Sequence, residues 1–458
     1  MIINEIGEKI IKNLEEKLNR MVANGMNFSE MVMEVQDSMN KLGTSIVEEV
    51  VEEYNKAIHE SEGRKKVWRV VRCDERGIMT SMGEVKINRY YYRHKRTGEY
   101  AYLVDEALGL EKNDRVDISL KAELIKQAGE RSYEKASKHN RFAQVSKQTV
   151  LNCIRENGVM KEGEKEEEKK EVRYLYIEAD EDHIAYQNGE SGLAKLIYVH
   201  EGIKKENNRG ELQNVHYFAS VVSSNEELWM EVADYIYERY DIEKIEKIYI
   251  SGDGAMWIRR GVEYLPKSVF ILDRFHINEY IKKAAGSNEE MREALSLALD
   301  AGDRIGVSKI LREAYERAIN ENEKGRILSV RKYFMNNWDG IEAKTRYASV
   351  LGCSAEGHVS HVISERLSSR PMGWSEIGAE QMVRLRVFVR NGGDIKAEMR
   401  KKKPERVNSL SRRTIQEIRR KIGFGFEKHN NIPILKGKKD TIIFPALKSL
   451  QQTRWQVI

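Results

Sequence analysis

The sequence lacks a hydrophobic run long enough to cross a membrane, and it lacks a cysteine framework. A spanning helix needs roughly 18 or more apolar residues in a row, and no stretch of the 458 residues reaches that length. The cysteines, Cys73, Cys153 and Cys353, are far apart, which argues against a disulfide scaffold and a paired zinc site. The N-terminus, MIINEIGEKI, has acidic residues where a secretory signal would have positive ones. We therefore expect a reduced, cytoplasmic protein with no membrane segment.

The whole chain also lacks a strong charge of one sign, although its charges are unevenly distributed. The net charge is only +5, with 33% charged residues. Residues 1–60 carry 6 Lys and Arg against 12 Asp and Glu, whereas residues 64–96 and residues 396–421 each carry 11 against 3. Two basic blocks after an acidic leader indicate local surfaces for polyanions. The length predicts two or three domains.

The N-terminal part predicts helices followed by a small sheet. Ile2, Ile6 and Ile10 begin an amphipathic pattern, so residues 1–60 should form helices that pack on one another or make a dimerisation seam. Residues 64–110 then alternate with period two in VWRVVR, VKINRYYY and YAYLV, which predicts a basic β-meander with separators at Gly77, Gly83 and Gly98. Its basic residues lie between tyrosines. This favours a surface that follows a nucleic-acid backbone, or a solvated face whose charges prevent edge pairing.

Residues 115–160 predict three helices with the spacing of a helix-turn-helix unit. Ser132 and Ser146 stand where the second and third helices should be capped. The third helix would present Lys147, Gln148 and Asn152 to a DNA groove. The alternative is ordinary helix packing. The segment 161–171, KEGEKEEEKKE, has no apolar residue and predicts a charged linker.

The region 172–285 has an α/β pattern. Strands are expected at 172–180, 193–200 and 215–223, followed by a helix and then a strand that stops at Gly252-Asp253-Gly254. This is the element order of a ribonuclease H-like sheet, in which the first and fourth strands lie side by side at the centre. Asp180 should then stand beside Asp253.

A fifth strand, Val269 to Leu272, ends in Asp273 and His276 at the same edge of the sheet. Residues 286–350 predict a helical insertion, and residues 351–395 the last part of the core. There Ser354 should cap a helix that carries Glu356. Residues 396–458 predict a basic C-terminal tail.

Three carboxylates from separate parts of the chain fit a two-metal site. Asp180, Asp253 and Glu356 would supply the oxygen ligands that Mg²⁺ or Mn²⁺ prefers, and two such ions promote in-line phosphoryl transfer. Each assignment has an alternative. Glu178 and Asp182 compete for the first position, Asp253 has the position of a helix N-cap, and Glu356 the position of a first-turn glutamate. The competitors for the third position are Glu365, Glu376 and Glu380.

Four strings resemble the ISLre-two family of insertion-sequence transposases, which are DDE-type enzymes related to the Mutator-like group. They are IEADEDHIAYQ, YISGDGAMWI, ILDRFHINEYI and CSAEGHVSHVISERLSSRPMGW. The resemblance implies a ribonuclease H-like core with a helical insertion, and Asp180, Asp253 and Glu356 as its catalytic, metal-binding acids. Asp273 and His276 match the DxxH element, which in Mutator-like enzymes usually starts with Cys. Asp182 remains a supporting residue.

The resemblance also implies a reaction and partners. The protein would bind the terminal inverted repeats of its element, cleave double-stranded DNA with two Mg²⁺ or Mn²⁺ ions, and transfer the strand to target DNA as a homodimer or larger assembly. Arg366 and Arg370 are predicted to bind phosphates, with an exposed helix face as the alternative. Two other functions stay open: a catalytically inactive DNA-binding protein, and a ribonuclease H-type nuclease.

Overall fold

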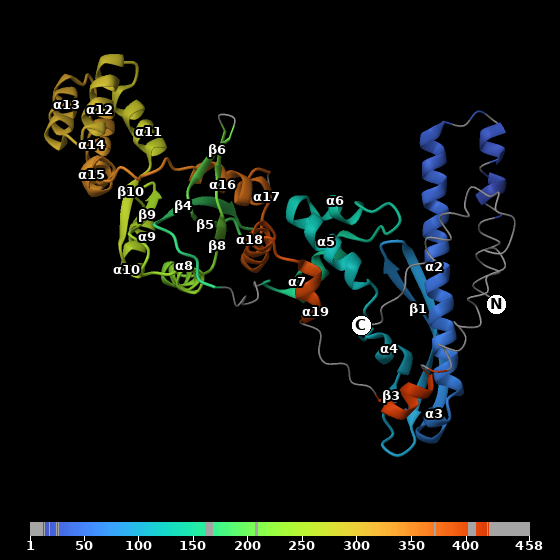
Figure 1. Ribbon diagram of the computed structural model, residues 1–458. Helices are drawn as coiled ribbons and strands as arrows, with labels where there is room; N and C mark the ends of the chain where they lie inside the picture. Colours follow the sequence, from blue (N-terminus) through green and yellow to red (C-terminus); the bar gives the residue numbers. More distant parts are fainter. Residues whose placement is uncertain are drawn as a thin grey trace. The chain divides into compact units, whose positions relative to one another are not determined.

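The computed structural model describes residues 12, 14–17, 19–23, 25, 27–160, 168–206, 209–370, 372–401, 409–418 and 420. The chain divides into two compact units, each described here by itself (Figure 1). Unit 1 comprises Met1–Ile125, Tyr133–Val150 and Met399–Ile458, and unit 2 comprises Lys126–Ser132 and Leu151–Glu398. Most of the predicted linker, residues 161–167, lies outside the described residues.

Unit 1 combines a long helix with a three-stranded antiparallel sheet of order β1-β2-β3. Its elements are α2 (Phe28–Glu60), α3 (Glu62–Val67), β1 (Trp68–Thr80), β2 (Gly83–His94), β3 (Tyr100–Ala101), α4 (Leu103–Leu108) and α6 (Tyr133–Ser137); α5 (Ile118–Glu130) and α7 (Lys147–Asn157) belong partly to each unit. The predicted meander is confirmed. Gly83 and Gly98 have positive φ at the strand junctions, whereas Gly77 lies inside β1, where it pairs with Lys86, and is not a separator.

The core of unit 1 lies between α2 and the sheet. Ile58 and Tyr92 are fully buried there, because the strand pattern turns alternate residues toward the helix. Leu410 and Ile418 are buried in the same core. These residues belong to the predicted C-terminal tail, so residues 409–418 pack as part of unit 1; residues 421–458 lie outside the described residues.

Unit 2 is built on a five-stranded mixed sheet of order β10-β9-β4-β5-β8. The strands are β4 (Tyr174–Ala185), β5 (Ser191–His200), β8 (His216–Ser220), β9 (Lys247–Gly252) and β10 (Ser268–Leu272). β4, β9 and β10 run parallel, while β5 is antiparallel to both β4 and β8. The prediction that the first and fourth strands are neighbours is confirmed. A further hairpin, β6 (Ile203–Glu206) with β7 (Arg209–Leu212), was not predicted.

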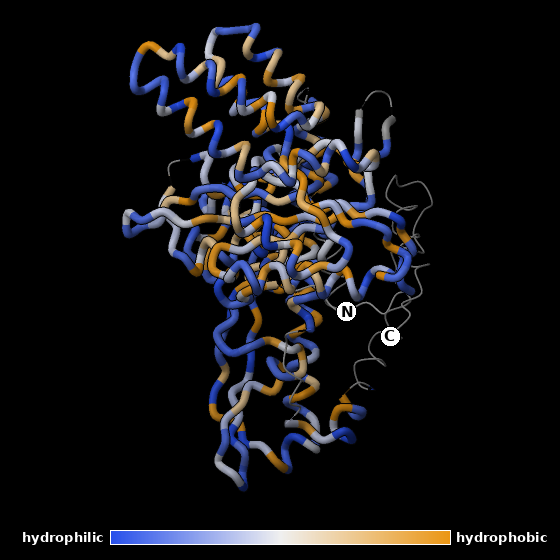
Figure 2. Tube along the Cα trace, turned by 90° about the vertical axis from the view of Figure 1, so that its left-hand side faces the viewer, coloured by the Kyte–Doolittle hydropathy of each residue, from blue (hydrophilic) through white to orange (hydrophobic). Residues whose placement is uncertain are grey.

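Helices of unit 2 pack around this sheet. They are α8 (Asn225–Arg239), α9 (Met256–Arg259), α10 (Gly261–Tyr264), α11 (Arg274–Ala285), α12 (Glu289–Asp300), α13 (Arg304–Arg317), α14 (Glu321–Asn336), α15 (Trp338–Arg346), α16 (Ala355–Val359), α17 (Glu365–Leu367) and α18 (Glu376–Arg390), with a π-helix (Ser360–Ser364) between α16 and α17. The last helix, α19 (Ile395–Lys401), belongs partly to each unit. The predicted insertion is α12 to α15, which gathers beyond β10 (Figure 1). In these helices hydrophobic and hydrophilic residues alternate along each turn (Figure 2, top).

The insertion joins the sheet through a close helix contact. A Cβ at Gly340 of α15 would lie 2.6 Å from the ring of Phe270 on β10, so only glycine allows this approach. In the described part of the chain, no helix combines the length and the apolar character that a membrane crossing requires.

Candidate active site

Three acids lie on or directly after parallel strands of the unit 2 sheet. Asp180 lies inside β4, which continues to Ala185, so the prediction that the first strand ends at Asp180 is wrong. The pairing of β4 with β9 ends at Glu178 and Ser251, and Asp180 and Asp253 each stand two positions beyond it, close enough for the charge of Asp253 to act on Asp180. Asp273 follows β10 directly, and its N–H donates to the carbonyl of Gly252 at 2.9 Å. Carboxyl ends of parallel strands are where α/β proteins gather polar groups.

Two glycines shape the turn that carries Asp253. A Cβ at Gly252 would lie 2.8 Å from the carbonyl oxygen of Ala179, so glycine lets β9 approach β4 closely. Gly254 has φ +93°, and a Cβ there would lie 2.6 Å from Asn337 Oδ1. Asp253 Oδ1 accepts the N–H of Ala255 at 2.8 Å. Asp253 is therefore not the helix N-cap that was the alternative interpretation: the N-cap of α9 is Ala255, and Asp253 bonds within the turn that precedes the helix.

Asp180 is a buried carboxyl without full compensation. Its pKa is raised to about 7, first because burial penalises the charged form; the Glu181 N–H, which donates to Oδ1 at 2.8 Å, lowers the pKa. The negative charges of Asp253 and Glu356 raise it further, and nearby His276 lowers it. Oδ2 is buried and has no hydrogen-bond partner within the described residues. The three predicted acids therefore share one electrostatic neighbourhood.

Asp182 and Glu178, the alternatives to Asp180, are both engaged in other contacts. Asp182 Oδ2 accepts the hydroxyl of Ser364 at 2.7 Å and the hydroxyl of Ser368. Glu178 is buried, and its Oε1 lies 3.0 Å from His200 Nε2. Asp180 is thus the member of this strand face with a buried carboxylate oxygen that has no hydrogen-bond partner within the described residues.

Glu178 also holds the start of the helix that carries Glu356. Its Oε2 accepts the N–H and the hydroxyl of Ser354, and the hydroxyl of Tyr198. Ser354 was predicted to cap this helix; it occupies the N-cap position, but its hydroxyl makes no capping bond. With Glu178 at one end and Asp182 at the other, β4 holds the whole helical segment from α16 to α17. A π-helix interrupts that segment, as is common at functional sites.

Asp273 and His276 form a pair at the start of α11. Asp273 Oδ1 caps the helix by accepting the N–H of Phe275 at 3.1 Å, and its Oδ2 lies 3.2 Å from His276 Nδ1. This hydrogen bond raises the pKa of His276, and partial burial lowers it. The charges of Asp253 and Asp180 raise it as well. The pKa of His276 therefore lies above its ordinary value.

The other candidates for the third acid of the site, Glu365, Glu376 and Glu380, either make structural contacts or are exposed at the surface. Glu380 is buried and accepts the N–H of Val221 at 2.7 Å and the guanidinium of Arg384 at 2.9 Å, so it fastens α18 to the end of β8. Glu365 is exposed and lies 3.3 Å from Arg386. Glu376 is exposed in the first turn of α18. Glu356, exposed in the first turn of α16, is the competitor whose charge acts on Asp180.

The insertion contributes contacts that the sequence did not predict. The hydroxyl of Tyr333 on α14 donates to the carbonyl of Asp253 at 2.6 Å. Asn337 is buried beside Gly254 and accepts from Arg259 at 2.8 Å. Tyr333 thus fixes the backbone of the second acid, and Asn337 joins the same region to the Arg259 side chain. No motif in the sequence pointed to these residues, because their partners lie about eighty positions away.

The donor set fits a hard divalent cation, although its side chains do not form a ready cage. Within the described residues, no group of three His, Cys, Asp or Glu side chains stands close enough together to hold an ion. The unpartnered Oδ2 of Asp180 and the mutual repulsion of three carboxylates are nevertheless what a cation would relieve. Cys353 and His358 offer no zinc site: the Cys353 thiol has a raised pKa from burial, and His358 Nδ1 lies 2.8 Å from the hydroxyl of Tyr217.

The predicted DNA-binding residues differ in exposure. Lys147, Gln148 and Asn152 are exposed on α7, and Arg370 is exposed after α17. Arg366 is buried: its Nε donates to the carbonyl of Ala128 at 2.9 Å, and its guanidinium lies over the ring of Trp374. The phosphate-binding prediction for Arg366 is therefore wrong in this structure, because packing uses the group that a phosphate would need.

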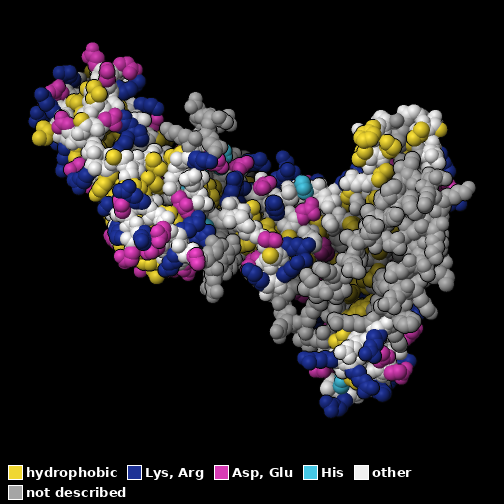
Figure 3. Space-filling model, viewed as in Figure 1, with side chains coloured by type: hydrophobic (Ala, Val, Ile, Leu, Met, Phe, Trp, Pro, Cys, Tyr) yellow, Lys and Arg dark blue, Asp and Glu magenta, His cyan; other side chains and the backbone are white. Residues whose placement is uncertain are grey.

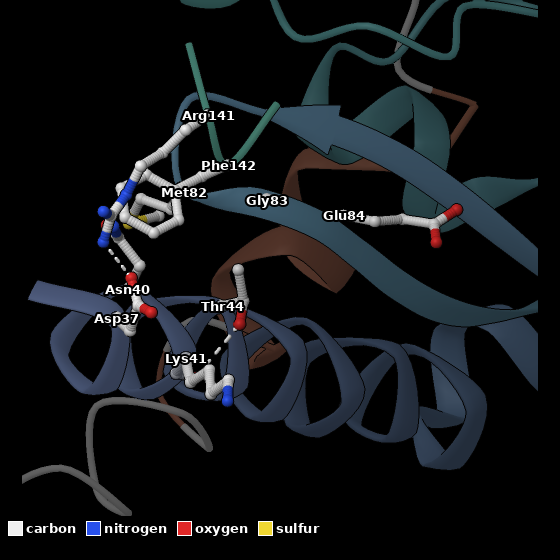
Figure 4. A pocket seen from close by; sticks show the side chains of 9 residues that line it. All are labelled: Asp37, Asn40, Lys41, Thr44, Met82, Gly83, Glu84, Arg141 and Phe142. Atoms are coloured by element: carbon white, nitrogen blue, oxygen red, sulfur yellow. Dashed lines mark hydrogen bonds and ion pairs between the residues drawn. The ribbon is translucent and has the colours of Figure 1, made fainter. Parts of the chain in front are cut away.

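A hollow of about 540 Å³ in unit 1 lies between α2, the β1–β2 turn and the loop before α7 (Figure 4). It is lined by Asp37, Asn40, Lys41, Thr44, Met82, Gly83, Glu84, Arg141 and Phe142. Arg141 forms an ion pair with Asp37 across it. All of its lining residues belong to unit 1, so it is not part of the site that Asp180, Asp253 and Glu356 make up in unit 2.

Comparison with known proteins places the chain in a family. A family model described as "Uncharacterised protein family (UPF0236)" matches residues 21–403. A UPF0236 protein of Caldanaerobacter subterraneus subsp. tengcongensis is 43% identical over 448 residues, covering 97% of this chain and 96% of that protein. Another from the same organism, whose printed name joins eleven locus labels, is 44% identical and covers 94% of this chain and 93% of its own length. A UPF0236 protein of Streptococcus gallolyticus, named for the vanSb 3′ region, is 26% identical over 85% of this chain and 86% of its own. The chain therefore belongs to the UPF0236 family.

Proposed function

We propose that this chain is a DDE-type DNA transposase of the ISLre-two kind, with a ribonuclease H-like catalytic core in unit 2. The observation that carries the proposal is the electrostatic coupling of Asp180 to both Asp253 and Glu356. These residues are 73 and 176 positions away from Asp180 in the sequence. The three acids come from the inside of β4, the turn after β9 and the first turn of α16. A buried carboxyl whose pKa is raised by burial and also by acids from separate elements is typical of functional sites.

The order of the unit 2 sheet supports the fold part of the proposal. Three antiparallel strands, β4, β5 and β8, precede helix α8, and β9 then returns to lie parallel to β4. This is the order expected of a ribonuclease H-like sheet. The helices α12 to α15 stand between the second and third acids, where the resemblance implies an insertion.

A name among the relatives supports the biological part. One relative carries eleven locus labels of a single organism in its printed name. Many loci for one protein within a genome is what repeated copying of a mobile element produces. The exposed polar residues Lys147, Gln148 and Asn152 on α7 suit a helix-turn-helix-like contact with DNA.

In this proposal, Asp180, Asp253 and Glu356 would hold two Mg²⁺ or Mn²⁺ ions. When bound, such ions activate the attacking oxygen and stabilise the leaving oxygen of an in-line displacement. The chain's own residues prepare the site. Glu178 and Asp182 hold the segment that carries Glu356, and Tyr333 fixes the backbone of Asp253. His276, whose pKa is raised, offsets the acids' charge when it is protonated.

The test is cleavage of DNA that carries the ends of the element, with Mg²⁺ or Mn²⁺ and the full chain. We expect a nick at the 3′ end of the element and joining of that end to target DNA. Asp253→Asn should abolish both reactions, and Glu376→Gln, at an exposed acid outside the site, should leave them unchanged. Cleavage by Asp253→Asn at the normal rate would refute the assignment. If the chain binds the ends but does not cleave them with metal, the hypothesis of an inactive DNA-binding protein is favoured. If it cleaves RNA–DNA hybrids in preference to DNA, the hypothesis of a ribonuclease H-type nuclease is favoured.

A further inference from the structure

Two arginines lie directly opposite each other on the unit 1 sheet. Arg69 on β1 pairs with Arg93 on β2, and both side chains are exposed. Like charges in this position repel each other and destabilise a sheet. Neighbouring Arg72 forms an ion pair with Asp74. Among the ion pairs formed within the described residues, none includes Arg69 or Arg93. The pair therefore carries uncompensated positive charge on a rigid element.

Tyrosine rings support the guanidinium groups on this side of the sheet. Arg93 also pairs with Tyr100 on β3, and its Cζ lies 5.7 Å from the centre of that ring. Tyr100 is 52% exposed and stacks on Tyr91 at 5.3 Å. Arg72 Cζ lies 4.5 Å over the ring of Tyr91. Stacking on a ring orients a guanidinium while leaving its N–H groups free for an anion.

We propose that this arginine–tyrosine face, made of Arg69, Arg72, Arg93, Tyr91 and Tyr100, binds the phosphate backbone of DNA. Arg69 and Arg93 contact phosphates, while Tyr91 and Tyr100 hold Arg72 and Arg93 in place. The choice of DNA as the polyanion rests on the proposed function; the need for a polyanion rests on the unpaired charge. Further Lys and Arg side chains, with some acids among them, are exposed at the end of unit 1 where α3 and β3 lie (Figure 3).

The face is distinct from the candidate active site, since all of its residues belong to unit 1. It also differs from the predicted groove contact of α7, which would distinguish base sequences. Phosphate contacts carry no sequence information and fix the position of a protein along the duplex. The face should therefore strengthen binding to any duplex, with or without the ends of the element.

The test measures duplex binding by the full chain in the presence of EDTA, using fluorescence anisotropy from 50 to about 300 mM salt. Arg69→Gln with Arg93→Gln should reduce the slope of log K against log salt by about 1.8, because each lost phosphate contact removes about 0.9. At 0.1 M salt the affinity should fall on the order of tenfold to a hundredfold. The matched control, Lys309→Gln with Arg312→Gln, removes two exposed charges from α13 and should leave both values unchanged.

A second variant separates phosphate binding from folding. The variant Arg69→Lys with Arg93→Lys keeps both charges, so it should keep most of the salt slope. If this variant loses the slope while its thermal stability stays normal, the two arginines have a packing role and the proposal is overturned. An unchanged slope in the glutamine variant would also overturn it, as would equal binding of single-stranded RNA and duplex DNA. The metal-free assay is independent of catalysis. A chain that binds DNA through this face but never cleaves it would refute the proposed function and leave this inference intact.

Discussion

Replacing Asp180 with asparagine should stabilise the metal-free protein while it abolishes DNA cleavage. Asp180 is only 7% exposed, and its pKa is raised from 3.8 to about 7. A raised carboxyl pKa means that the folded state binds the proton more tightly than the unfolded chain. Stability is then highest below pH 4 and falls as the pH rises from about 4 to 7. Above pH 7 the penalty is constant.

The size of the effect follows from the pKa difference of about three units. At about 1.4 kcal/mol per unit, the charged carboxylate costs on the order of 4 kcal/mol at pH 8 and about 1.5 kcal/mol at pH 5. Asparagine is nearly isosteric and carries no charge. It should therefore raise the melting temperature of unit 2 by several degrees at pH 8, by less at pH 5, and by little at pH 3.

The assay is thermal unfolding of the wild type and the variant at the three pH values, without and with Mg²⁺. Mg²⁺ should stabilise the wild type and leave Asp180→Asn unchanged, since binding to the native state raises stability by mass action. Asp182→Asn is the matched control on the same strand face. It should lower the melting temperature, because it weakens the bonds to Ser364 and Ser368. A variant Asp180→Asn that melts below the wild type at pH 8 would refute the reasoning.

Further predictions concern the surroundings of the acids. Glu178→Gln should destabilise unit 2 by about 2–4 kcal/mol, because it weakens buried bonds to His200 and Ser354, and hydrogen exchange should increase in residues 354–367. Normal protection of that segment would contradict the role given to Glu178. Gly254→Ala should cost at least about 1–3 kcal/mol in denaturant unfolding, since φ is +93° and Asn337 fills the space; Gly357→Ala, which meets open space, is its control. Arg366→Ala should lower the melting temperature and leave the salt slope of DNA binding unchanged, whereas a reduced slope would restore its phosphate role.

Periodicity and strand-end chemistry were sufficient to predict most of unit 2. The strand that ends at Asp253 and the helix at 225–239 have patterns that are decided locally, by apolar alternation and by capping residues. The pairing of β4 with β9 was also predictable, because short connections and a crossover helix leave few ways to order the strands.

The sequence by itself determined that Asp253 and Asp273 follow strands, since each comes directly after an apolar run. It placed the end of the first strand at Asp180, whereas β4 continues to Ala185 because it pairs with β5. It could not decide among Glu178, Asp180 and Asp182, which share one face of β4. Only the tertiary structure distinguishes them. Ser354 donates hydrogen bonds to Glu178, and Ser364 and Ser368 donate to Asp182, whereas Asp180 keeps a buried oxygen without a partner within the described residues. In the same way, Arg366 resembles a phosphate ligand in the sequence, and its burial depends on Ala128, 238 positions away. A side chain's partners are set by packing between distant segments, and a local pattern carries no record of them.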